Sequence, residues 1–577
     1  MGALLDAAIA HYGPALTVSD PFSGGGTVTF EAMKRGLKTY AQDLYPWPAR
    51  GLAAALGACK TAELQAAASR VLATLEPHRS SYKTASGVEL SHILRVRVST
   101  CLQCKGRAYE FPHLLVSMTS RGVNETGAYF GCRICGHLTC RARGVNSFTC
   151  GGCGAPWSLN REVTGCPHCF HGDLRREGWQ AALVQELAWS RGQLRAVLRP
   201  VADGDPVVFH TPSAAHSALT AKIPPGKETK RLLENGFDTW SDLYTQRQSK
   251  VLVDGLKAIA ELDCAIAVKD RLAFSLLGAA EMPAFLSRWD RFNLKPFEGM
   301  ANHRYTQTTL AVESNLLSPV GRGTIPRRLG AATQALEWLN ESRERPPKVA
   351  TTTPGMPGRK KTDWDVLVTT GSSERQALRT GSVNVVVTDP PYFDDVQYGE
   401  LARLFHVWLS VYDPSVVVDE RSEAVPNRTR GTSAADYEAT IAACLAESRR
   451  TLTDNGRLIL TFHNKKIAAW RALAGAIATA NLKVTALAAV WAENRHDHCK
   501  RNVNAMLHDL VIECAPIGAP RLVDSLLEFT PKSVAEKNLA AMGLALADCV
   551  ASRDSMNIGA KYRRHLDHFG VRKRLIE

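Results

Sequence analysis

The fold is decided by one stretch of sequence, Val385-Val386-Val387-Thr388-Asp389-Pro390-Pro391-Tyr392. Its three valines predict a buried strand, because β-branched apolar residues favour that conformation. The two prolines end the strand in a stiff turn, since each ring fixes the backbone angle φ near −65°. Ligands of open α/β sheets bind at this end of the strands. The carboxylate, prolyl carbonyls and aromatic ring of the turn suit an exocyclic base nitrogen. A proline-rich turn with a buried tyrosine is the structural alternative.

A glycine-rich turn near the N-terminus follows a second predicted strand. Residues 15–18 predict a strand, residues 28–35 a helix and residues 38–42 the next strand, which ends in an acid. The glycines let a ligand approach the backbone, and an acid about 20 residues on is placed to bind ribose hydroxyls. The pattern FxGxG after Asp-Pro differs from the dinucleotide-binding pattern GxGxxG. The candidate cofactor-binding residues are Asp20, Phe22, Gly24, Gly26 and Asp43.

The composition favours a polyanionic partner and a metal. The chain of 577 residues carries a formal net charge of +14, which favours nucleic acid. No apolar run reaches membrane-spanning length, and the N-terminus lacks the features of a signal peptide. We therefore expect a cytoplasmic protein, in which 15 cysteines argue against a disulfide framework and for metal ligands.

Four CxxC pairs predict two structural zinc sites. Each pair places two thiolates on one tight turn, and eight thiolates make two tetrahedral sites with no open position. The simplest pairing is sequential, with the first two pairs on one zinc and the last two on the other; interleaved pairing is an alternative. His137, His168 and Cys140 are interpreted as bystanders. The predicted ligands are Cys101, Cys104, Cys132, Cys135, Cys150, Cys153, Cys166 and Cys169. The arginines among them favour a nucleic-acid partner: Arg107, Arg121, Arg133, Arg141 and Arg143.

Six regions follow from the order of these signals. Residues 1–95 form the first part of an α/β catalytic domain, 96–175 a double zinc ribbon, 176–345 a mostly helical insertion for DNA or target recognition, 346–361 a flexible linker, 362–519 the second part of the catalytic domain and 520–577 a basic helical extension.

Two smaller features lie in these regions. Residues 289–293 and 302–305 mix aromatic, basic and amide groups that suit stacking on unpaired bases, although a polar face with partly buried aromatic rings has the same composition. Residues 495–499, Arg-His-Asp-His-Cys, are too close together to ligate one ion well, so we interpret them as a solvated loop.

The two turns together resemble motifs of the amino-group DNA methyltransferases. Asp20 to Thr27 is similar to their motif I, and Asp389 to Tyr392 is similar to their motif IV. More narrowly, these turns, the CxxC pairs and residues 237–248 (FDTWSDLYTQRQ) make residues 15–515 resemble the zinc-ribbon-containing adenine-specific DNA methylase family. The resemblance implies a Rossmann-like, seven-stranded methyltransferase sheet with a terminal hairpin, interrupted by an insertion that carries two zinc ribbons and a helical region.

The resemblance also implies an activity. S-adenosyl-L-methionine would be the cofactor, its cationic groups near Asp20, and the methyl acceptor would be N6 of an adenine flipped out of double-stranded DNA. The implied catalytic residues are Asp389, Pro390, Pro391 and Tyr392. N4 of cytosine or RNA is an alternative acceptor. A different class of function is an inactive zinc-ribbon nucleic-acid-binding subunit of a larger complex. Restriction-modification and phage defence are both compatible roles.

One difference from the family concerns the N-terminus. About 14 residues precede the first predicted strand, whereas the family has an N-terminal segment expected to close over the cofactor. Either a separate polypeptide supplies that segment or the reading frame begins late. We therefore expect the isolated chain to bind S-adenosyl-L-methionine weakly, and micromolar affinity of the purified chain would contradict this expectation.

Overall fold

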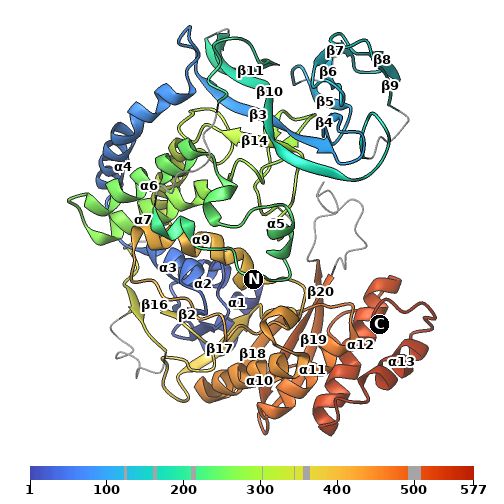
Figure 1. Ribbon diagram of the computed structural model, residues 1–577. Coiled ribbons are helices and arrows are strands. Elements are labelled where there is room, and N and C mark those ends of the chain that lie inside the picture. Colours follow the sequence, from blue (N-terminus) through green and yellow to red (C-terminus); the bar gives the residue numbers. More distant parts are fainter. Residues whose placement is uncertain are drawn as a thin grey trace. The chain divides into compact units, whose positions relative to one another are not determined.

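The structure, a computed structural model, describes residues 1–121, 127–159, 165–190, 192–208, 216–301, 303–342, 345–354, 364–491 and 508–577. The chain divides into two compact units (Figure 1). Unit 1 comprises Met1–Ala58, Leu336–His406 and Ser415–Glu577, and unit 2 comprises Cys59–Ala335 and Val407–Pro414. Residues 355–361 of the expected linker, the loop at 495–499 and Asn302 lie outside the described residues.

Unit 1 contains an eight-stranded sheet in the order β15-β16-β2-β1-β17-β18-β20-β19. Neighbours from β15 to β18 pair in parallel, whereas β20 pairs antiparallel with both β18 and β19. The strands are β1 (Thr17–Asp20), β2 (Lys38–Asp43), β15 (Val349–Thr352), β16 (Val366–Thr370), β17 (Val383–Thr388), β18 (Leu452–Phe462), β19 (Leu482–Trp491) and β20 (His508–Pro516).

Helices cover both faces of this sheet, which explains the run of valines in β17. Val385 and Val387 pack in one core cluster with residues of α1 and α2, whereas Val386 packs in another with residues of α10 and α11. A parallel strand buried on both faces reads as a continuous apolar run. The helices of unit 1 are α1 (Gly2–Tyr12), α2 (Thr27–Lys34), α3 (Pro46–Leu56), the 3-10 helix η5 (Arg428–Arg430), α10 (Ala434–Thr451), α11 (Ile467–Thr479), α12 (Val534–Ser552) and α13 (Ile558–His568). The orange and red helices α10 to α13 pack in sequence against one another beside β18 to β20 (Figure 1).

Unit 2 is built on a five-stranded sheet with the path β11-β10-β3-β14, in which β4 also pairs with β3. Smaller sheets join β5-β6-β7, β8-β9 and β12-β13. The strands are β3 (Leu90–Cys101), β4 (Arg107–Tyr109), β5 (Leu115–Met118), β6 (Gly127–Gly131), β7 (Leu138–Ala142), β8 (Ser147–Thr149), β9 (Pro156–Ser158), β10 (Leu174–Ser190), β11 (Gln193–Pro200), β12 (Trp289–Asp290), β13 (Lys295–Pro296) and β14 (Leu310–Ser314). The helices are α4 (Thr61–Leu75), η1 (Glu76–Tyr82), η2 (Ser217–Thr220), α5 (Lys230–Glu234), η3 (Trp240–Leu243), α6 (Gln246–Glu261), α7 (Ile266–Leu277) and η4 (Gly278–Glu281). Two further helices, α8 (Ile325–Glu341) and α9 (Tyr398–Tyr412), have residues in both units.

The observed elements differ from the sequence expectations at three places. The sheet has eight strands rather than seven, because β15 lies in the segment expected to be a linker. The first segment of unit 1 ends at Ala58 rather than at residue 95. Residues 90–95, expected in the first part of the catalytic domain, belong to β3 of unit 2, whose register is fixed by pairing with β10 and β14. No helix in the described part of the chain combines the length and the apolar character needed to cross a membrane.

Candidate active site and metal sites

The two turns singled out in the sequence lie side by side at the carboxyl ends of two central strands of the unit 1 sheet. β1 and β17 are parallel neighbours, with Val18 opposite Val385 and Ser19 opposite Val386. The hydroxyl of Thr388, at the end of β17, donates to Oδ1 of Asp20, at the end of β1, over 2.8 Å. The strand order also changes direction here, because β2 follows β1 on one side while β18 follows β17 on the other. Such a switch point at the carboxyl ends of parallel strands is a general ligand-binding position.

The glycine-rich turn is anchored to the end of β2 and leaves open space beside Gly24 and Gly25. Gly24 and Gly26 have φ values of 46° and 80°, a left-handed conformation that favours glycine. The Gly24 amide donates to Oδ2 of Asp43 over 3.0 Å, which anchors the turn to the end of β2. A side chain at Gly24 or Gly25 would meet no protein atom, so the backbone there faces open space. At Gly26, by contrast, a side chain would collide with Leu52. The first two glycines therefore leave room for a ligand, and the third allows packing.

Two carboxyl groups at this turn, one before it and one at the end of β2, have raised pKa values. Burial raises the pKa of Asp20 to about 7, against the opposing effects of hydrogen bonds from Thr388 and from the Phe22 amide. The nearby charges of Asp43 and Asp389 raise it further. Burial likewise raises the pKa of Asp43 to about 6, although hydrogen bonds from the amides of Tyr45, Gly24 and Leu44 lower it. Raised carboxyl pKa values at a strand edge are typical of functional sites, since a cationic ligand would compensate the buried charge.

The turn after β17 presents Asp389 to solvent and fixes its orientation. Thr461, in the neighbouring strand β18, donates its hydroxyl to Oδ1 of Asp389 over 2.6 Å. The Tyr392 hydroxyl donates to the same Thr461 oxygen over 3.1 Å, so one threonine connects both side chains. The carbonyl of Pro391 accepts bonds from the Tyr437 hydroxyl and the Phe393 amide. The carbonyl of Pro390 has no such partner among the described residues.

Tyr392 is wedged between two other rings. Its ring makes edge contacts with Phe462 and His463, at centroid separations of 5.3 and 4.7 Å. Burial and then the negative charge of Asp389 raise the pKa of Tyr392 well above its ordinary value, so the phenol keeps its proton. His463 is in turn bonded through Nδ1 to Asp509 of β20. Tyr392 is thus a half-buried ring at the edge of the site, held by its neighbours on β18.

Three polar residues of this site are not among the residues predicted from the sequence. Thr461, His463 and Asp509 all contact the turn directly or through one neighbour. Thr461 and His463 could have been found, because they follow the apolar part of a predicted strand and so lie at the same sheet edge as the other two turns. Asp509 could not, since its place depends on the antiparallel pairing of β20 with β18, which puts Val511 opposite Thr461.

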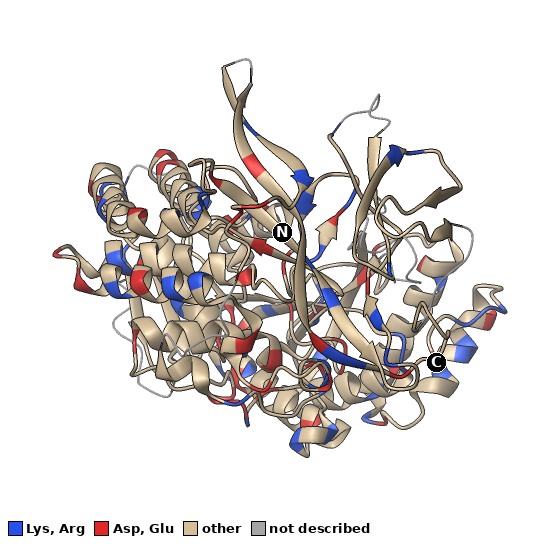
Figure 2. Cartoon of the chain, turned by 45° about the horizontal axis from the view of Figure 1, so that its top comes forward, with Lys and Arg blue, Asp and Glu red and all other residues tan. Residues whose placement is uncertain are grey.

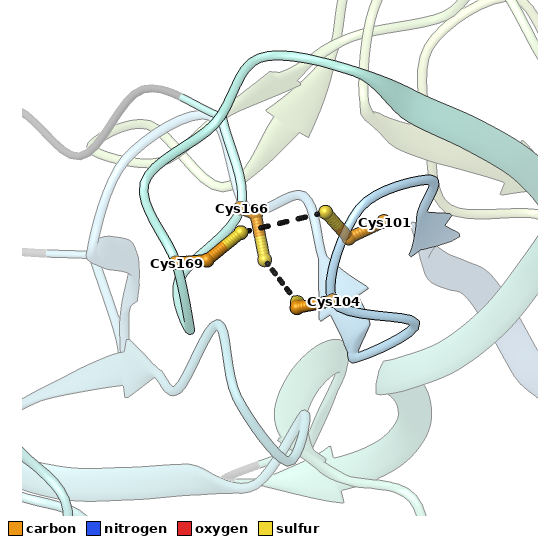
Figure 3. Close-up of side chains that lie close together, drawn as sticks. All are labelled: Cys101, Cys104, Cys166 and Cys169. Carbon is orange, nitrogen blue, oxygen red and sulfur yellow. Dashed lines mark hydrogen bonds between the residues drawn. The ribbon is translucent and has the colours of Figure 1, made fainter.

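The eight predicted zinc ligands form two four-cysteine clusters, but sequential pairing is wrong. Cys101 and Cys104 meet Cys166 and Cys169 (Figure 3), whereas the two inner pairs meet each other. The second cluster consists of Cys132, Cys135, Cys150 and Cys153. The cause is the long β3–β10 ladder, in which Cys101 lies opposite Leu174. This ladder brings the first and fourth pairs together and leaves the inner two as a separate ribbon between them.

The geometry of both clusters fits a tetrahedral zinc ion. In each cluster the four sulfur atoms all lie within 4.8 Å of one another. The closest contacts measure 3.6 Å for Cys101–Cys169 and 3.5 Å for Cys104–Cys166. Thiolates about 2.3 Å from a tetrahedral zinc would lie roughly 3.8 Å apart, so little adjustment is needed. None of the bystander candidates Cys140, His137 and His168 belongs to either cluster.

All four CxxC turns have the same backbone geometry. The amide of the residue after the second cysteine donates to the carbonyl of the first cysteine, over 2.9–3.0 Å. That residue has a positive φ in every turn; it is Lys105, Gly136, Gly154 or Phe170, with φ between 61° and 77°. The arginines of the ribbons are only partly available to a partner, since Arg133 is buried and bonds the Gly165 carbonyl.

Comparison of the chain with protein-family models and with curated proteins finds no match. The geometry of the site and the resemblance of its motifs therefore carry the functional proposal.

Proposed function

We propose that this protein is an S-adenosyl-L-methionine-dependent methyltransferase that acts on an exocyclic amino group of DNA, most simply N6 of adenine. The observation that carries the proposal is the hydrogen bond between Thr388 and Asp20. It joins the two motif-like turns, which are 368 residues apart in the sequence, at the switch point of one parallel sheet.

The sheet supports this proposal. Apart from β15, it has seven strands, and it ends in the antiparallel pair β20 and β19. That is the arrangement that the resemblance to the methyltransferases implies. The insertion between the two motifs also corresponds to a separate compact unit that carries both cysteine clusters.

The residues of the glycine-rich turn suit the cofactor. Open backbone at Gly24 and Gly25 leaves room beside two carboxyl groups, and a sulfonium or ammonium group would be attracted to Asp20. Asp43, at the end of β2, is placed for ribose hydroxyls, and it already fixes the turn through the Gly24 amide. When bound, S-adenosyl-L-methionine supplies an electrophilic methyl group.

The second turn suits the amine. Asp389 and the Pro390 carbonyl are the two acceptors for the N–H groups of an exocyclic amine, and Tyr392 supplies the aromatic surface. Both hydrogen bonds draw the nitrogen lone pair out of conjugation with the base, which makes the nitrogen a better nucleophile. Transfer would form the N–CH₃ bond as the S–CH₃ bond of the cofactor breaks and S-adenosyl-L-homocysteine leaves, and one amine proton would pass to Asp389 or to water. Correct positioning of the two reactants supplies much of the rate.

The experiment is a methyl-transfer assay on DNA with the purified chain and its Asp389→Ala variant. N6-methyladenine, N4-methylcytosine and their RNA counterparts are separated by mass spectrometry of the nucleosides. We expect N6-methyladenine from the parent protein and a loss of at least about a thousandfold in the variant, because the main acceptor for the amine is removed. Unchanged transfer by Asp389→Ala would reject the site, and N4-methylcytosine would correct the acceptor. DNA binding without transfer would favour the alternative of an inactive nucleic-acid-binding subunit.

A further inference from the structure

Unit 2 contains a groove made of two adjoining cavities of about 640 and 450 Å³. We call it the Arg176 groove. Five residues line both cavities: Arg97, Arg176, Asn235, Gln307 and Thr308. Its volume lies within the range of sites that hold a nucleotide-sized ligand. All of its lining residues belong to unit 2 and to the insertion between the two motifs.

The larger cavity has an aromatic wall. Trp179 and Phe237 flank Phe285, at ring separations of 5.4 and 6.5 Å and with interplanar angles of 31° and 28°. Phe285 is buried, whereas Trp179 and Phe237 are partly exposed to the cavity that they line. Near-parallel rings at the border of a cavity are suited to stacking on a nucleobase, which every base permits through its π face.

A β-bulge brings this wall next to a cation. In the ladder with β3, Arg176 lies opposite Ser99 and Gly178 lies opposite Val98, so Glu177 is the extra residue. Regular alternation would put Arg176 and Trp179 on opposite faces of β10. The bulge shifts the alternation by one residue, and both side chains line the same cavity. Arg175, by contrast, lies outside the groove and is close to Glu177.

The smaller cavity is cationic. Figure 2 shows basic and acidic residues interspersed over the helices and strands, but this cavity is lined by three arginines and no acidic residue. Arg97 is paired with Glu110. Within the described part of the chain, no ion pair involves Arg176 or Arg288, and Nε of Arg288 is buried without a hydrogen-bond partner. Unpaired guanidinium groups in a cavity favour a phosphate, which they bind in a bidentate manner.

From these contacts we infer that the Arg176 groove binds an unpaired nucleotide, with the base against Trp179 and the phosphate beside Arg176 and Arg288. At the junction of the cavities, Asn235 and Gln307 each donate an amide N–H to the Arg231 carbonyl, so their remaining amide atoms are the groups left for the base edge. The shared chemistry is that of a nucleotide, whether free or within a strand. That the strand is DNA rests on the proposed function; the groove itself does not depend on methyl transfer.

The test measures binding to the full chain by fluorescence anisotropy, without S-adenosyl-L-methionine. The probes are a labelled single-stranded deoxyoligonucleotide, the same strand with abasic sites, its duplex, and AMP as competitor. The variants are Trp179→Ala, Trp179→Phe, Arg176→Ala and the matched control Arg175→Ala, each checked for folding by circular dichroism. Arg175→Ala removes the same charge from the adjacent position of the same strand.

The inference predicts a specific pattern of losses. Trp179→Ala should weaken binding of the single strand about tenfold or more, Trp179→Phe should restore most of it, and neither should change binding of the abasic strand. Arg176→Ala should lower affinity for both strands and reduce the salt dependence by about 0.7 in the log–log slope. Competition by AMP would identify a free nucleotide as a sufficient ligand, and its failure would assign the site to a strand.

Two results would overturn the inference. Equal losses for Arg175→Ala and Arg176→Ala would show general attraction to a basic surface, and an unchanged affinity of folded Trp179→Ala would exclude stacking. A chain that binds the single strand in this pattern but transfers no methyl group would contradict the proposed function alone.

Discussion

Thr461 is the single side chain that connects Asp389 with Tyr392. Its hydroxyl donates to the carboxylate and accepts from the phenol, so it orients both groups without touching the proposed methyl acceptor. We predict that Thr461→Val lowers the rate of methyl transfer roughly ten- to a hundredfold, because a hydrogen bond to a charged group contributes about 1.5–3 kcal/mol. Single-turnover assays measure this rate directly.

The matched control for this prediction lies on the same strand. Thr453 is at the other end of β18, and no hydrogen bond involves its side chain in the described part of the structure. Thr453→Val should leave the transfer rate unchanged within about twofold. A role of Thr461 in stability alone would lower the melting temperature of Thr461→Val without changing single-turnover rates at low temperature, and that result would contradict the prediction.

Asp20 should make binding of the proposed cofactor dependent on pH. Burial raises the pKa of Asp20 to about 7, so the carboxyl is mainly protonated below this pH and ionised above it. A cationic cofactor favours the ionised form. The affinity for S-adenosyl-L-methionine should therefore rise about tenfold between pH 5.5 and 7, with the rise ending as Asp20 becomes fully ionised. Isothermal titration calorimetry in two buffers of different ionisation enthalpy should detect the proton released on binding.

Asp20→Asn is the variant that isolates this effect. It keeps the acceptor for the Thr388 hydroxyl but removes the charge, so its affinity should be lower and, from about pH 7 upward, nearly independent of pH. Some dependence should persist below pH 6, because the pKa of Asp43 is also raised, to about 6. If the variant shows the same pH profile as the parent protein, the titrating group is not Asp20.

At the scale of elements, the sequence predicts the strands of unit 1 well and the partners of the cysteines poorly. Strand β17, helix α11 and the final antiparallel pair all have local signals, in the form of apolar runs that end in turn residues. The cysteine pairing depends instead on the β3–β10 ladder, whose partners are between 73 residues (Cys101 and Leu174) and 96 residues (Leu90 and Glu186) apart. Strand pairing over such distances has no local signature.

This corrected pairing predicts an asymmetry between double variants. Cys101→Ser with Cys166→Ser removes two ligands from one cluster and none from the other, so the chain should retain one of its two zinc ions. Cys101→Ser with Cys132→Ser removes one ligand from each cluster, so both ions should be held weakly and removed by mild chelation. Zinc per chain, measured by mass spectrometry after dialysis against a chelator, distinguishes the two. Sequential pairing requires the opposite result.

At the scale of the whole molecule, the structure buries much of one stretch on which the family resemblance depends. Residues 237–248 support the family resemblance, yet Trp240, Tyr244 and Gln248 are buried in unit 2. Arg95 and Glu313 are also almost fully buried, although charged residues usually predict surface. Sequence patterns give the apolar core and the chemistry of single turns. They do not indicate which charges will be paired inside, because each partner comes from a different element.

Glu313 is the centre of that buried pairing. It receives ion pairs from Arg95 of β3 and Arg247 of α6, and hydrogen bonds from Tyr82 and Thr245. Burial alone would raise the pKa of Glu313, but the two guanidinium groups hold it well below its ordinary range. Its contribution to stability is therefore present above about pH 4.3 and is lost as the pH falls through its lowered pKa.

Replacing Glu313 by a neutral residue should destabilise unit 2 far more than the same replacement at an exposed glutamate. Glu313→Gln leaves the buried Arg95 and the partly buried Arg247 without their anion, so we expect a loss of about 3–5 kcal/mol in the free energy of unfolding. The exposed pair Lys230–Glu234 provides the control, since Glu234→Gln should change this free energy by less than about 1 kcal/mol. Urea unfolding, monitored by hydrogen exchange in β3 and β14, measures the free energy of unfolding of both variants. Equal unfolding midpoints for the two would mean that the surrounding hydrogen bonds, rather than the charge of Glu313, hold these strands together.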